Sequence, residues 1–409
     1  MQTDIGSRIP SYATAVMNAL EKSGHCGYLV GGSLRDLLLG KAPHDFDMTT
    51  DASPEEMLEI FSDFRVIPTG LKHGTLTVLS EGNPIEVTTH RVDGDYKDSR
   101  RPESVSFTRR LSDDLSRRDF TVNAMAWHEK TGLVDLFGGQ EDLQAGIIRA
   151  VGDPATRFTE DALRILRAFR FSAQLDFDIE ENTLLAAKKT KEGLGRISAE
   201  RIFSEITRLL ISPAAAKGLS ALFAAECEKW VFFDTVPCLQ RAPLLADLPA
   251  EAPLRLAFLL AEESVDRVRA LCRCLKAPNA FCDRVCSLIT AAARPIPTSL
   301  YEARRFVTAH WQEWEGALTM RRALGEDVGQ AHTLCRTVAK NGTAVEIRRL
   351  AVNGKELQEA LSVRPAKTGA LLLRLQDLVF ADPARNKKKV LMELAAEIVA
   401  AESEFCHGK

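Results

Sequence analysis

The chain of 409 residues has no long apolar run, and none of its stretches approaches the roughly 20 residues that a membrane-spanning helix needs. Its first ten residues, MQTDIGSRIP, also lack the basic and then apolar pattern of a secretory signal. We therefore expect a cytoplasmic protein with no membrane partner. A strong charge of one sign is missing too, because the formal net charge is −3. This excludes a uniformly basic nucleic-acid coat, so any RNA binding must use local basic surfaces.

Paired metal-binding cysteines are also lacking, although the chain has nine cysteines. The densest group is Cys272, Cys274, Cys282 and Cys286. Its spacing is not the C-x2-C pattern of a zinc ribbon, and the first two thiols would face different sides of a helix. Buried thiols in a helical core are therefore favoured over a zinc site.

What the chain does have is a distinctive stretch at residues 28–50, YLVGGSLRDLLLGKAPHDFDMTT. An apolar strand, Tyr28–Val30, runs into Gly31 and Gly32 and then into a helix-like segment. The glycines allow the backbone to approach a bulky anion, and the N–H groups of the following helix would face that anion. The pattern predicts a phosphate cradle.

Two carboxylates follow on a second predicted strand, Asp45-Phe46-Asp47. Because strand side chains repeat every two residues, Asp45 and Asp47 would point to the same face. They repel each other unless a cation lies between them, so the pair predicts a metal site beside the phosphate cradle. Glu86 on a later predicted strand could complete a three-carboxylate site or simply face solvent, and the pattern leaves both open.

Apolar spacing predicts several local elements. They are an amphipathic helix over 11–25 with Ala13, Val16, Met17 and Leu20 inward, a helix over 55–64 capped by residues 51–54, and paired strands over 73–79 and 84–90. Over residues 211–300, apolar helices broken by prolines predict a helical body. Another helix pair is predicted to start at Ile296, with Trp311 and Trp314 in its core.

The combined motif GGxxRDxLLGxxxxDxD resembles the signature of the polymerase-β-like nucleotidyltransferases, in the branch of the tRNA nucleotidyltransferases and bacterial poly(A) polymerases. Further motifs agree in the same order, namely RRDFTVNAMA at 117–126, EDALRILRAFRF at 160–171 and ISAERI at 197–202. The resemblance is strong over residues 28–210 and weaker beyond. It implies an α+β fold, with a nucleotidyltransferase α/β head followed by a mostly α-helical neck, body and tail.

The predicted division is a catalytic head over 1–150, a neck over 151–210, a body over 211–295 and a tail over 296–409. The neck begins where the sequence changes to a nearly continuous helical pattern, at Asp153. The resemblance assigns base selection to the neck and tRNA binding to the tail. The ISAERI motif is given a bracing role in the neck and no chemistry.

In the second motif, Arg118 offers a planar fork suited to a phosphate or a ribose-side contact. Asp119 and Asn123, four residues apart, would lie on one side of a helix that starts here. An ion-paired helix start would explain Asp119 nearly as well, but it would not explain two adjacent arginines in an otherwise apolar segment. The resemblance assigns nucleotide positioning to Gly31, Gly32, Arg35 and Arg118.

In the fourth motif, Thr159 is the predicted N-cap of a helix on which Asp161, Arg164, Arg167 and Arg170 recur every three residues. On an isolated helix this pattern would more simply be a solvated face. The resemblance implies instead that Asp161 and Arg164 read the base. A carboxylate accepts from an exocyclic amino group and a guanidinium donates to a ring acceptor, a combination that C and A share and that G and U lack. Arg167 and Arg170 would extend the contact toward phosphate or base.

The segment 91–118 is polar, is rich in Arg and Asp, and predicts a mobile loop. In the tRNA nucleotidyltransferases a flexible loop at this place helps the site to add the terminal A, and enzymes that add only CC are shortened there. The run from Asp93 to Pro102 shows no evident deletion, which favours full CCA addition.

The resemblance therefore implies template-independent addition of C, C and A to the 3′ end of tRNA from CTP and ATP. Asp45 and Asp47 would bind two Mg2+ ions, of which one lowers the pKa of the tRNA 3′-OH and the other holds the triphosphate. The tRNA would be held through its backbone and acceptor-arm shape. No obligate protein partner is evident.

Two alternatives remain within the class, a poly(A) polymerase and an enzyme that adds only CC or only A. The same active site could serve each of them. A non-catalytic RNA-binding relative is the alternative from another class. It is disfavoured, because an idle protein has no reason to keep two repelling carboxylates on one strand face.

Overall fold

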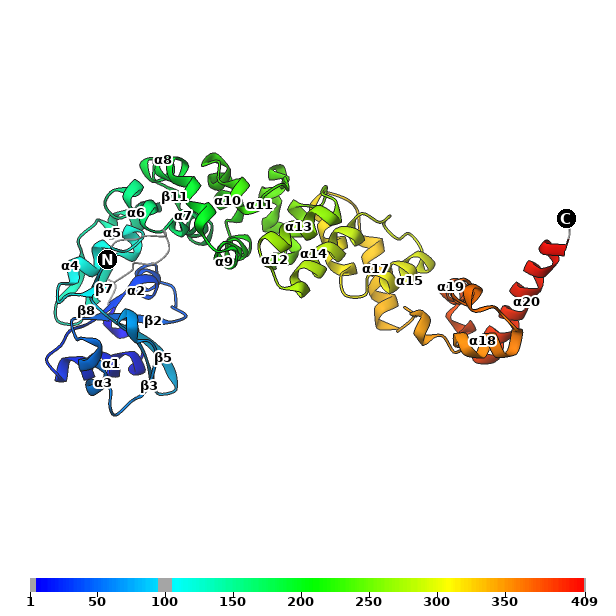
Figure 1. Ribbon diagram of the computed structural model, residues 1–409, viewed down its shortest axis with the longest axis horizontal. Coiled ribbons are helices and arrows are strands. Elements are labelled where there is room, and N and C mark those ends of the chain that lie inside the picture. Colours follow the sequence, from blue (N-terminus) through cyan, green and yellow to red (C-terminus); the bar gives the residue numbers. More distant parts are fainter. Residues whose placement is uncertain (1–4, 95–104, 408–409) are drawn as a thin grey trace. The chain divides into compact units, whose positions relative to one another are not determined.

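The computed structural model describes residues 5–94 and 105–407, and Figure 1 draws its helices and strands as a ribbon. The chain divides into two compact units. Unit 1 consists of residues 1–234 and 273–277, and unit 2 of residues 235–272 and 278–409. No helix among the described residues is long and apolar enough to cross a membrane. The four-part division predicted from the sequence is finer than these two units and stays a prediction.

Unit 1 contains a seven-stranded mixed sheet with the strand order β3-β4-β5-β2-β1-β8-β9. The strands are β1 (Gly27–Val30), β2 (Phe46–Thr50), β3 (Arg65–Gly70), β4 (Thr75–Ser80), β5 (Asn83–Thr89), β8 (Met125–His128) and β9 (Gly132–Asp135). Strand β2 runs parallel to β5 and antiparallel to β1. This register sets Asp47 on β2 beside Glu86 on β5, so two carboxylates share one region of the sheet.

Short helices accompany the sheet, namely α1 (Ser11–Lys22), α2 (Gly31–Leu38), α3 (Pro54–Ile60), α4 (Leu111–Ser116) and α5 (Gly139–Ala145). The amphipathic helix predicted over 11–25 is confirmed as α1, whose four predicted inward residues are all buried. The predicted cap of the next helix is confirmed as well. Ser53 and Glu56 exchange hydrogen bonds between their side chains and backbone N–H groups at the start of α3. Strands β4 and β5 form the predicted hairpin.

The helix predicted to begin in the second motif does not form. The chain there is extended, because Phe120 bridges Ala150 and the Thr121 N–H donates to the carbonyl of Arg149. Only a short 3-10 turn, Thr121–Asn123, follows. Pairing with residues 149–151 replaces the hydrogen bonds that a helix would have supplied.

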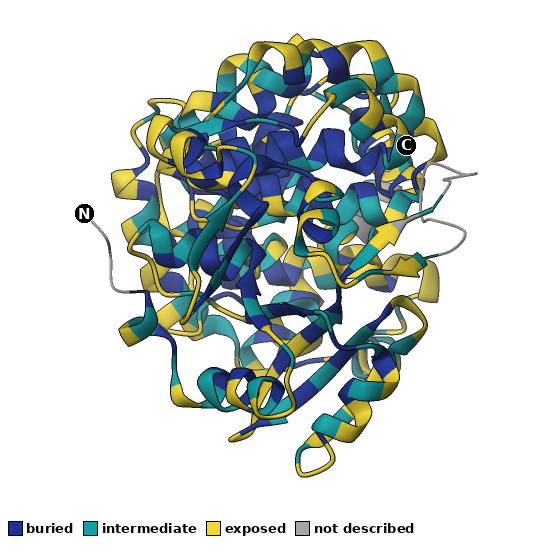
Figure 2. Ribbon diagram, turned by 90° about the vertical axis from the view of Figure 1, so that its left-hand side faces the viewer, coloured by how far each residue is buried: buried dark blue, intermediate teal, exposed yellow. Residues whose placement is uncertain are grey.

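The rest of unit 1 is mainly helical, with α6 (Pro154–Glu160), α7 (Leu163–Leu175), α8 (Glu181–Thr190), α9 (Ala199–Leu210), α10 (Ala215–Ala224) and α11 (Glu228–Phe232). Two short strands, β10 (Ile147–Ile148) and β11 (Asp178–Ile179), pair beside them. Helix α7 packs against α9 and α10, and most of its residues are buried. Figure 2 shows buried residues gathered in the interior strands and helices.

Thr159 is not the helix cap that the sequence predicted, because it lies inside α6, which Asp153 caps. The helical run is interrupted at Asp161, whose backbone is extended. The Asp161 carboxylate accepts a hydrogen bond from the Leu163 N–H at 3.0 Å, which satisfies one of the donors left open at the start of α7. Asp161 therefore lies at a break between two helices.

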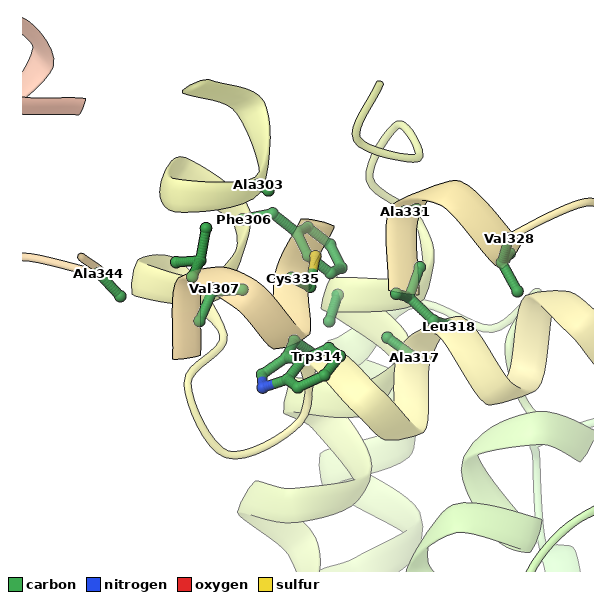
Figure 3. Close-up of a cluster of buried hydrophobic side chains, with 12 residues drawn as sticks. Ala303, Phe306, Val307, Trp314, Ala317, Leu318, Val328, Ala331, Cys335 and Ala344 are labelled. Atoms are coloured by element: carbon green, nitrogen blue, oxygen red, sulfur yellow. The ribbon is translucent and has the colours of Figure 1, made fainter. Parts of the chain in front are cut away.

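Unit 2 is helical and includes α12 (Ala252–Leu259), α14 (Asn279–Ala292), α15 (Leu300–Ala309), α16 (Trp314–Ala323), α17 (Gly329–Lys340), α18 (Gly354–Leu361), α19 (Pro365–Ala381) and α20 (Lys388–His407). Helix α13 (Val265–Cys274) contributes residues to both units. In one core cluster of unit 2, Phe306, Trp314 and Cys335 point toward one another (Figure 3). Trp314 is buried as predicted, whereas the prediction for Trp311 is wrong, since its exposed fraction is 50%. Helix α15 ends at Ala309, so the helical spacing of the two tryptophans does not hold.

This difference generates a prediction on stability. Replacing Trp314 by Ala should lower the free energy of unfolding of unit 2 by about 3–5 kcal/mol, because it leaves a cavity in the cluster. Trp311→Ala is the matched control and should change it by less than about 0.5 kcal/mol. Thermal or urea unfolding followed by circular dichroism measures both. Equal losses in the two variants would contradict the assignment of Trp314 to the core.

Candidate active site

A polar cleft of about 360 Å³ in unit 1 brings four of the predicted motifs together. The side chains that line it include Asp47, Glu86, Arg117, Arg118, Asp119, Asp161, Arg164, Arg167 and Arg201. The first five come from the sheet and the second motif, and the others come from α7, α9 and the break before α7. Residues more than a hundred positions apart in the sequence thus face one space.

One side of the cleft is acidic. Asp47 and Glu86 are register partners on β2 and β5, and the exposed Asp45 immediately precedes β2. Burial and the negative charges of Asp45 and Glu86 together raise the pKa of Asp47 to about 6, although the positive charge of Arg118 acts in the opposite direction. This carboxylate therefore lacks a sufficient positive counter-charge.

The carboxylates on the acidic side of the cleft are oxygen ligands of the kind that bind Mg2+. Within residues 5–94 and 105–407, no three His, Cys, Asp or Glu side chains are grouped closely enough to hold a metal by themselves. Mg2+ is commonly bound by one or two carboxylates together with substrate phosphates, so it does not require a cage of three protein ligands. An under-compensated pair of oxygen ligands beside the predicted phosphate cradle fits such an ion.

The predicted strand–glycine–helix cradle is present, because β1 leads directly into α2 at Gly31. Gly31 has a φ of 71°, which other residues rarely adopt. A Cβ atom there would lie 3.3 Å from Nη1 of Arg118 and 3.8 Å from Oδ2 of Asp47. Glycine at this position therefore lets Arg118 lie against the start of α2, beside the acidic side of the cleft.

Both arginines of the second motif face the cleft, and one buried carboxylate holds them. Arg117 donates to Oδ1 of Asp114 through Nε at 3.0 Å and Nη2 at 2.6 Å. Arg118 donates to Oδ2 of Asp114 through Nη2 at 3.1 Å. The Nε–H of Arg118 is buried and has no hydrogen-bond partner in the part of the chain that the structure describes. Asp114 belongs to none of the predicted motifs, so its role could not be predicted from the sequence.

Asp119 joins the second motif to α7. Arg167 donates to Oδ2 of Asp119 from Nε at 2.7 Å and pairs with it through Nη2 at 2.6 Å, while Asn123 donates to Oδ1 at 3.3 Å. Burial by itself would raise the pKa of Asp119, but the charge of Arg167 and these hydrogen bonds outweigh it and hold the pKa at about 2. Asp119 and Asn123 are therefore in contact as predicted, although no helix links them.

The structure does not bring Arg35 or Arg170 into the cleft. Arg35 is buried, and it donates to Asn123 at 2.8 Å and to its neighbour Asp36. Arg170 is buried beside Glu205, at 3.1 Å. Gly32 lies next to Arg35, since a Cβ on it would be 3.6 Å from Nη2 of Arg35. Nucleotide binding by these residues stays a prediction, and their observed contacts brace the groups around the cleft.

The two predicted base-reading residues are held by specific partners. Oδ2 of Asp161 accepts from Nη2 of Arg201 at 2.9 Å. Arg164 donates to Glu160 at 2.6 Å and to the backbone carbonyl of Arg117 at 3.0 Å. The ISAERI motif predicts only a bracing role. The structure adds that its arginine lines the cleft and reaches a carboxylate 40 residues earlier.

The predicted loop over 91–118 lies partly outside the described residues, which omit 95–104. In its described part, β6 (Arg91–Asp93) pairs antiparallel with β7 (Val105–Phe107), and α4 follows. The prediction of a loop is therefore wrong for these flanks. Most of the undeleted run from Asp93 to Pro102 lies outside the described residues, so full CCA addition on the basis of this run stays a prediction.

Family comparisons cover the two parts of unit 1. The family described as "Poly A polymerase head domain" matches residues 27–149, and the one described as "Probable RNA and SrmB- binding site of polymerase A" matches residues 176–232. The CCA-adding enzyme of Streptococcus mutans is 35% identical over 397 residues, which are 93% of this chain and 95% of that protein. The CCA-adding enzyme of Enterococcus faecalis is 36% identical over 410 residues, 94% of this chain and 95% of that protein.

The solved structures that are similar to this chain include CCA-adding enzymes as well. The CCA-adding enzyme of Bacillus stearothermophilus in complex with CTP has a TM-score of 0.84 and 30% identity, over 99% of this chain and 100% of that chain. The Thermotoga maritima enzyme complexed with tRNA_CCA, at 20% identity and a TM-score of 0.67, shares the fold. The fold class predicted from the sequence is confirmed. Since relatives more than 30% identical extend over nearly the whole chain, the protein belongs to the CCA-adding enzymes, a family of nucleotidyltransferases.

Proposed function

We propose that this protein adds C, C and A to the 3′ end of tRNA, using CTP and ATP and releasing pyrophosphate. The observation that carries the proposal is that one cleft holds the carboxylates of Asp47 and Glu86, the guanidinium groups of Arg117 and Arg118, and the two side chains Asp161 and Arg164. The relatives are CCA-adding enzymes, and solved examples contain CTP or tRNA. Because tRNA is the proposed substrate, the proposed place of the reaction is the cytoplasm.

Asp45 and Asp47 are the proposed ligands of Mg2+. Asp47 lines the cleft and is repelled by both Asp45 and Glu86, so a cation there would relieve an existing imbalance of charge. Mg2+ bound there would supply activation of the tRNA 3′-OH and stabilisation of the pyrophosphate leaving group. Glu86 is the register partner of Asp47, and its charge acts on Asp47, so Glu86 is a candidate for a third carboxylate ligand of the same ion.

The chain's own groups supply the other requirements of an in-line displacement. The 3′ oxygen of the tRNA bonds to the α-phosphorus while the bond to pyrophosphate breaks, so negative charge grows on the leaving group. Arg117 and Arg118 both line the cleft, and their guanidinium groups are suited to bind that charge. Both are fixed before the nucleotide arrives, which avoids reorganisation during the reaction.

Base selection is proposed for Asp161 and Arg164. The carboxylate would accept from the exocyclic amino group of C or A, and the guanidinium would donate to the neighbouring ring nitrogen. For G or U the donors and acceptors would meet like groups, and buried polar groups left unpaired reject a ligand strongly. The ion pair with Arg201 holds the Asp161 carboxylate in place, and the ion pair with Glu160 holds the guanidinium of Arg164.

The decisive experiment offers the purified protein a tRNA that lacks its last three nucleotides, with CTP alone, ATP alone, UTP or GTP alone, and CTP with ATP. Products that end in CCA are expected only with CTP and ATP together. The double variant D45A/D47A should add neither CMP nor AMP while still binding tRNA in a filter or fluorescence assay. Products that end only in CC or only in A, or long A tails, would replace the proposed activity by one of the alternatives. Addition at the full rate by the double variant would refute the metal assignment.

Arg164→Ala should weaken the preference for C and A over U and G by roughly 10- to 100-fold, since a well-formed edge contact is worth about 1–3 kcal/mol of discrimination. The ratio of kcat/KM for each nucleotide measures it. Arg208→Ala, which removes an exposed arginine of α9 that does not line the cleft, is the control. Unchanged discrimination in the Arg164 variant would take base reading away from α7.

The raised pKa of Asp47 predicts how pH affects metal binding. Below about pH 6 a proton competes for this carboxylate, so the apparent affinity for Mg2+ should fall about tenfold per pH unit. Without metal, the folded state binds this proton more tightly than the unfolded chain, so the contribution of Asp47 to stability is lost as pH rises from about 4 to 6.

The measurement is the shift of the thermal unfolding midpoint on adding Mg2+ at pH 7.5 and at pH 5. The shift should be larger at pH 7.5 and absent in D47N. In E55Q, which alters an exposed carboxylate on α3, it should match the wild type. An equal Mg2+ shift in D47N would show that the ion binds elsewhere.

A further inference from the structure

Asp114 on α4 is a fully buried carboxylate outside every predicted motif. It accepts hydrogen bonds from Arg117, Arg118 and Thr49, the last from Oγ1 at 3.2 Å. Burial alone would raise the pKa of Asp114, but the charges of Arg118 and Arg117 outweigh it and bring the pKa to about 2. The group is therefore an anion at any pH at which the enzyme works.

Its place in the chain explains why one carboxylate can serve two arginines. Asp114 lies three residues before Arg117 and four before Arg118, so a single helical turn brings all three together. Each oxygen takes a different arginine, Oδ1 for Arg117 and Oδ2 for Arg118. Two adjacent guanidinium groups would otherwise repel each other at the edge of the cleft.

We propose that Asp114 is a positioning residue, which acts through Arg117 and Arg118 by holding their guanidinium groups in the orientation that binds the triphosphate of the incoming nucleotide. The inference rests on the proposed function, in which these arginines bind the triphosphate. The proposed function does not name the residue that sets the geometry of these arginines. Asp114 is that residue, and its effect is confined to the binding of the triphosphate, without an effect on the choice of base.

The limit follows from how Arg164 is held. Its partners are the side chain of Glu160 and the backbone carbonyls of Arg157 and Arg117. None of these hydrogen bonds uses the Asp114 carboxylate. Loss of that carboxylate should therefore weaken the binding of every nucleotide triphosphate alike, and it should leave the choice among bases as it was.

The sign of the effect separates positioning from simple electrostatics. Removing a negative charge near the cleft makes the local field more positive, which by itself would tighten the binding of an anion. Releasing two arginines from fixed orientations would weaken it, because misplaced binding groups lose much of their effect. Asp114→Asn keeps the size of the side chain and removes the charge, so it tests the two directly.

The control is Asp113→Asn, which removes the same charge one residue earlier on α4. The contacts of Asp113 are with Thr108 and Ser112, and it does not hold Arg117 or Arg118. The assays are KM and kcat for CTP and for ATP, and competitive inhibition of CTP addition by inorganic triphosphate. D114N should raise both KM values and the inhibition constant for triphosphate by about tenfold with unchanged ratios of C and A to U and G. D113N should match the wild type or bind slightly tighter.

A second variant covers failure of D114N to fold, which circular dichroism and thermal unfolding would reveal. Thr49→Val removes the hydroxyl that contacts Asp114, the Thr88 carbonyl and Nδ1 of His90, and it leaves the carboxylate and both arginines in place. It should weaken triphosphate binding in the same direction and by less. In the R118Q background, D114N should add less to the loss than it does alone, because the two residues act through one contact.

Triphosphate binding by D114N that equals or exceeds that of the wild type would overturn the inference, and the same result in T49V would do so if D114N does not fold. A change in base selection by D114N would also overturn it. If R118Q binds inorganic triphosphate as the wild type does, the proposed function is wrong at that residue and the inference falls with it. If R118Q is weakened and D114N is not, only the inference falls.

Discussion

The ion pair between Asp119 and Arg167 is the contact on which the cleft depends. It joins the second motif, which follows the sheet, to α7, which carries the proposed base-reading arginine. Phe171 reinforces the joint, because the guanidinium carbons of Arg35, Arg167 and Arg170 lie 5.3, 5.2 and 4.2 Å from the centre of its ring. Together with the hydrogen bond from Arg164 to the backbone carbonyl of Arg117, this joint fixes the separation between the acidic strands and the proposed base-reading residues, so that one nucleotide could bridge them.

Charge is distributed unevenly within the cleft. Its arginines are paired with carboxylates before any nucleotide binds, Arg117 and Arg118 with Asp114, Arg164 with Glu160, Arg167 with Asp119, and Arg201 with Asp161. Asp47 and Glu86, by contrast, form no salt bridge within the described part of the chain, and the pKa of Asp47 is raised. The positive groups are therefore already organised, while the negative pair remains to be neutralised. A metal ion that arrives with the triphosphate would complete the balance.

The sequence predicts best what depends on neighbours along the chain. The strand–glycine–helix cradle, the buried face of α1 and the β4–β5 hairpin all follow from local periodicity and turn residues, and all are present. The errors arise where distant contacts decide. The extended backbone at Phe120 depends on pairing with Ala150, and the burial of Arg170 depends on Glu205 in another helix. A period of three residues shows that arginines share a face, but it cannot show which of them face a cleft and which face the core.

The role of Asp114 and the position of Arg201 in the cleft could not be predicted, for the same reason. Asp114 differs neither in type nor in spacing from the many charged residues on the surface of a helix, and the motif that contains Arg201 predicts only bracing. The partner of each side chain becomes visible only in the folded structure. Asp114 is distinguished by its complete burial. The helix that carries it has only six residues, which is too short for a periodic pattern of apolar residues to show which face is buried. Buried charges are found where they are paired, so the pairing and the burial are one observation made in three dimensions.

The break between α6 and α7 at Asp161 shows how a contact that the sequence does not predict could serve the proposed base selection. In an unbroken helix, the direction of the Asp161 side chain would be set only by its position along the helix. Here one carboxylate oxygen holds the Leu163 N–H and the other holds Arg201, so the side chain is fixed from two sides. Each oxygen keeps a further lone pair, and an ionised carboxylate can only accept hydrogen bonds. A base that offers an amino group can therefore bind Asp161 without displacing its partners, whereas a carbonyl at that place would face an acceptor that is unable to turn away.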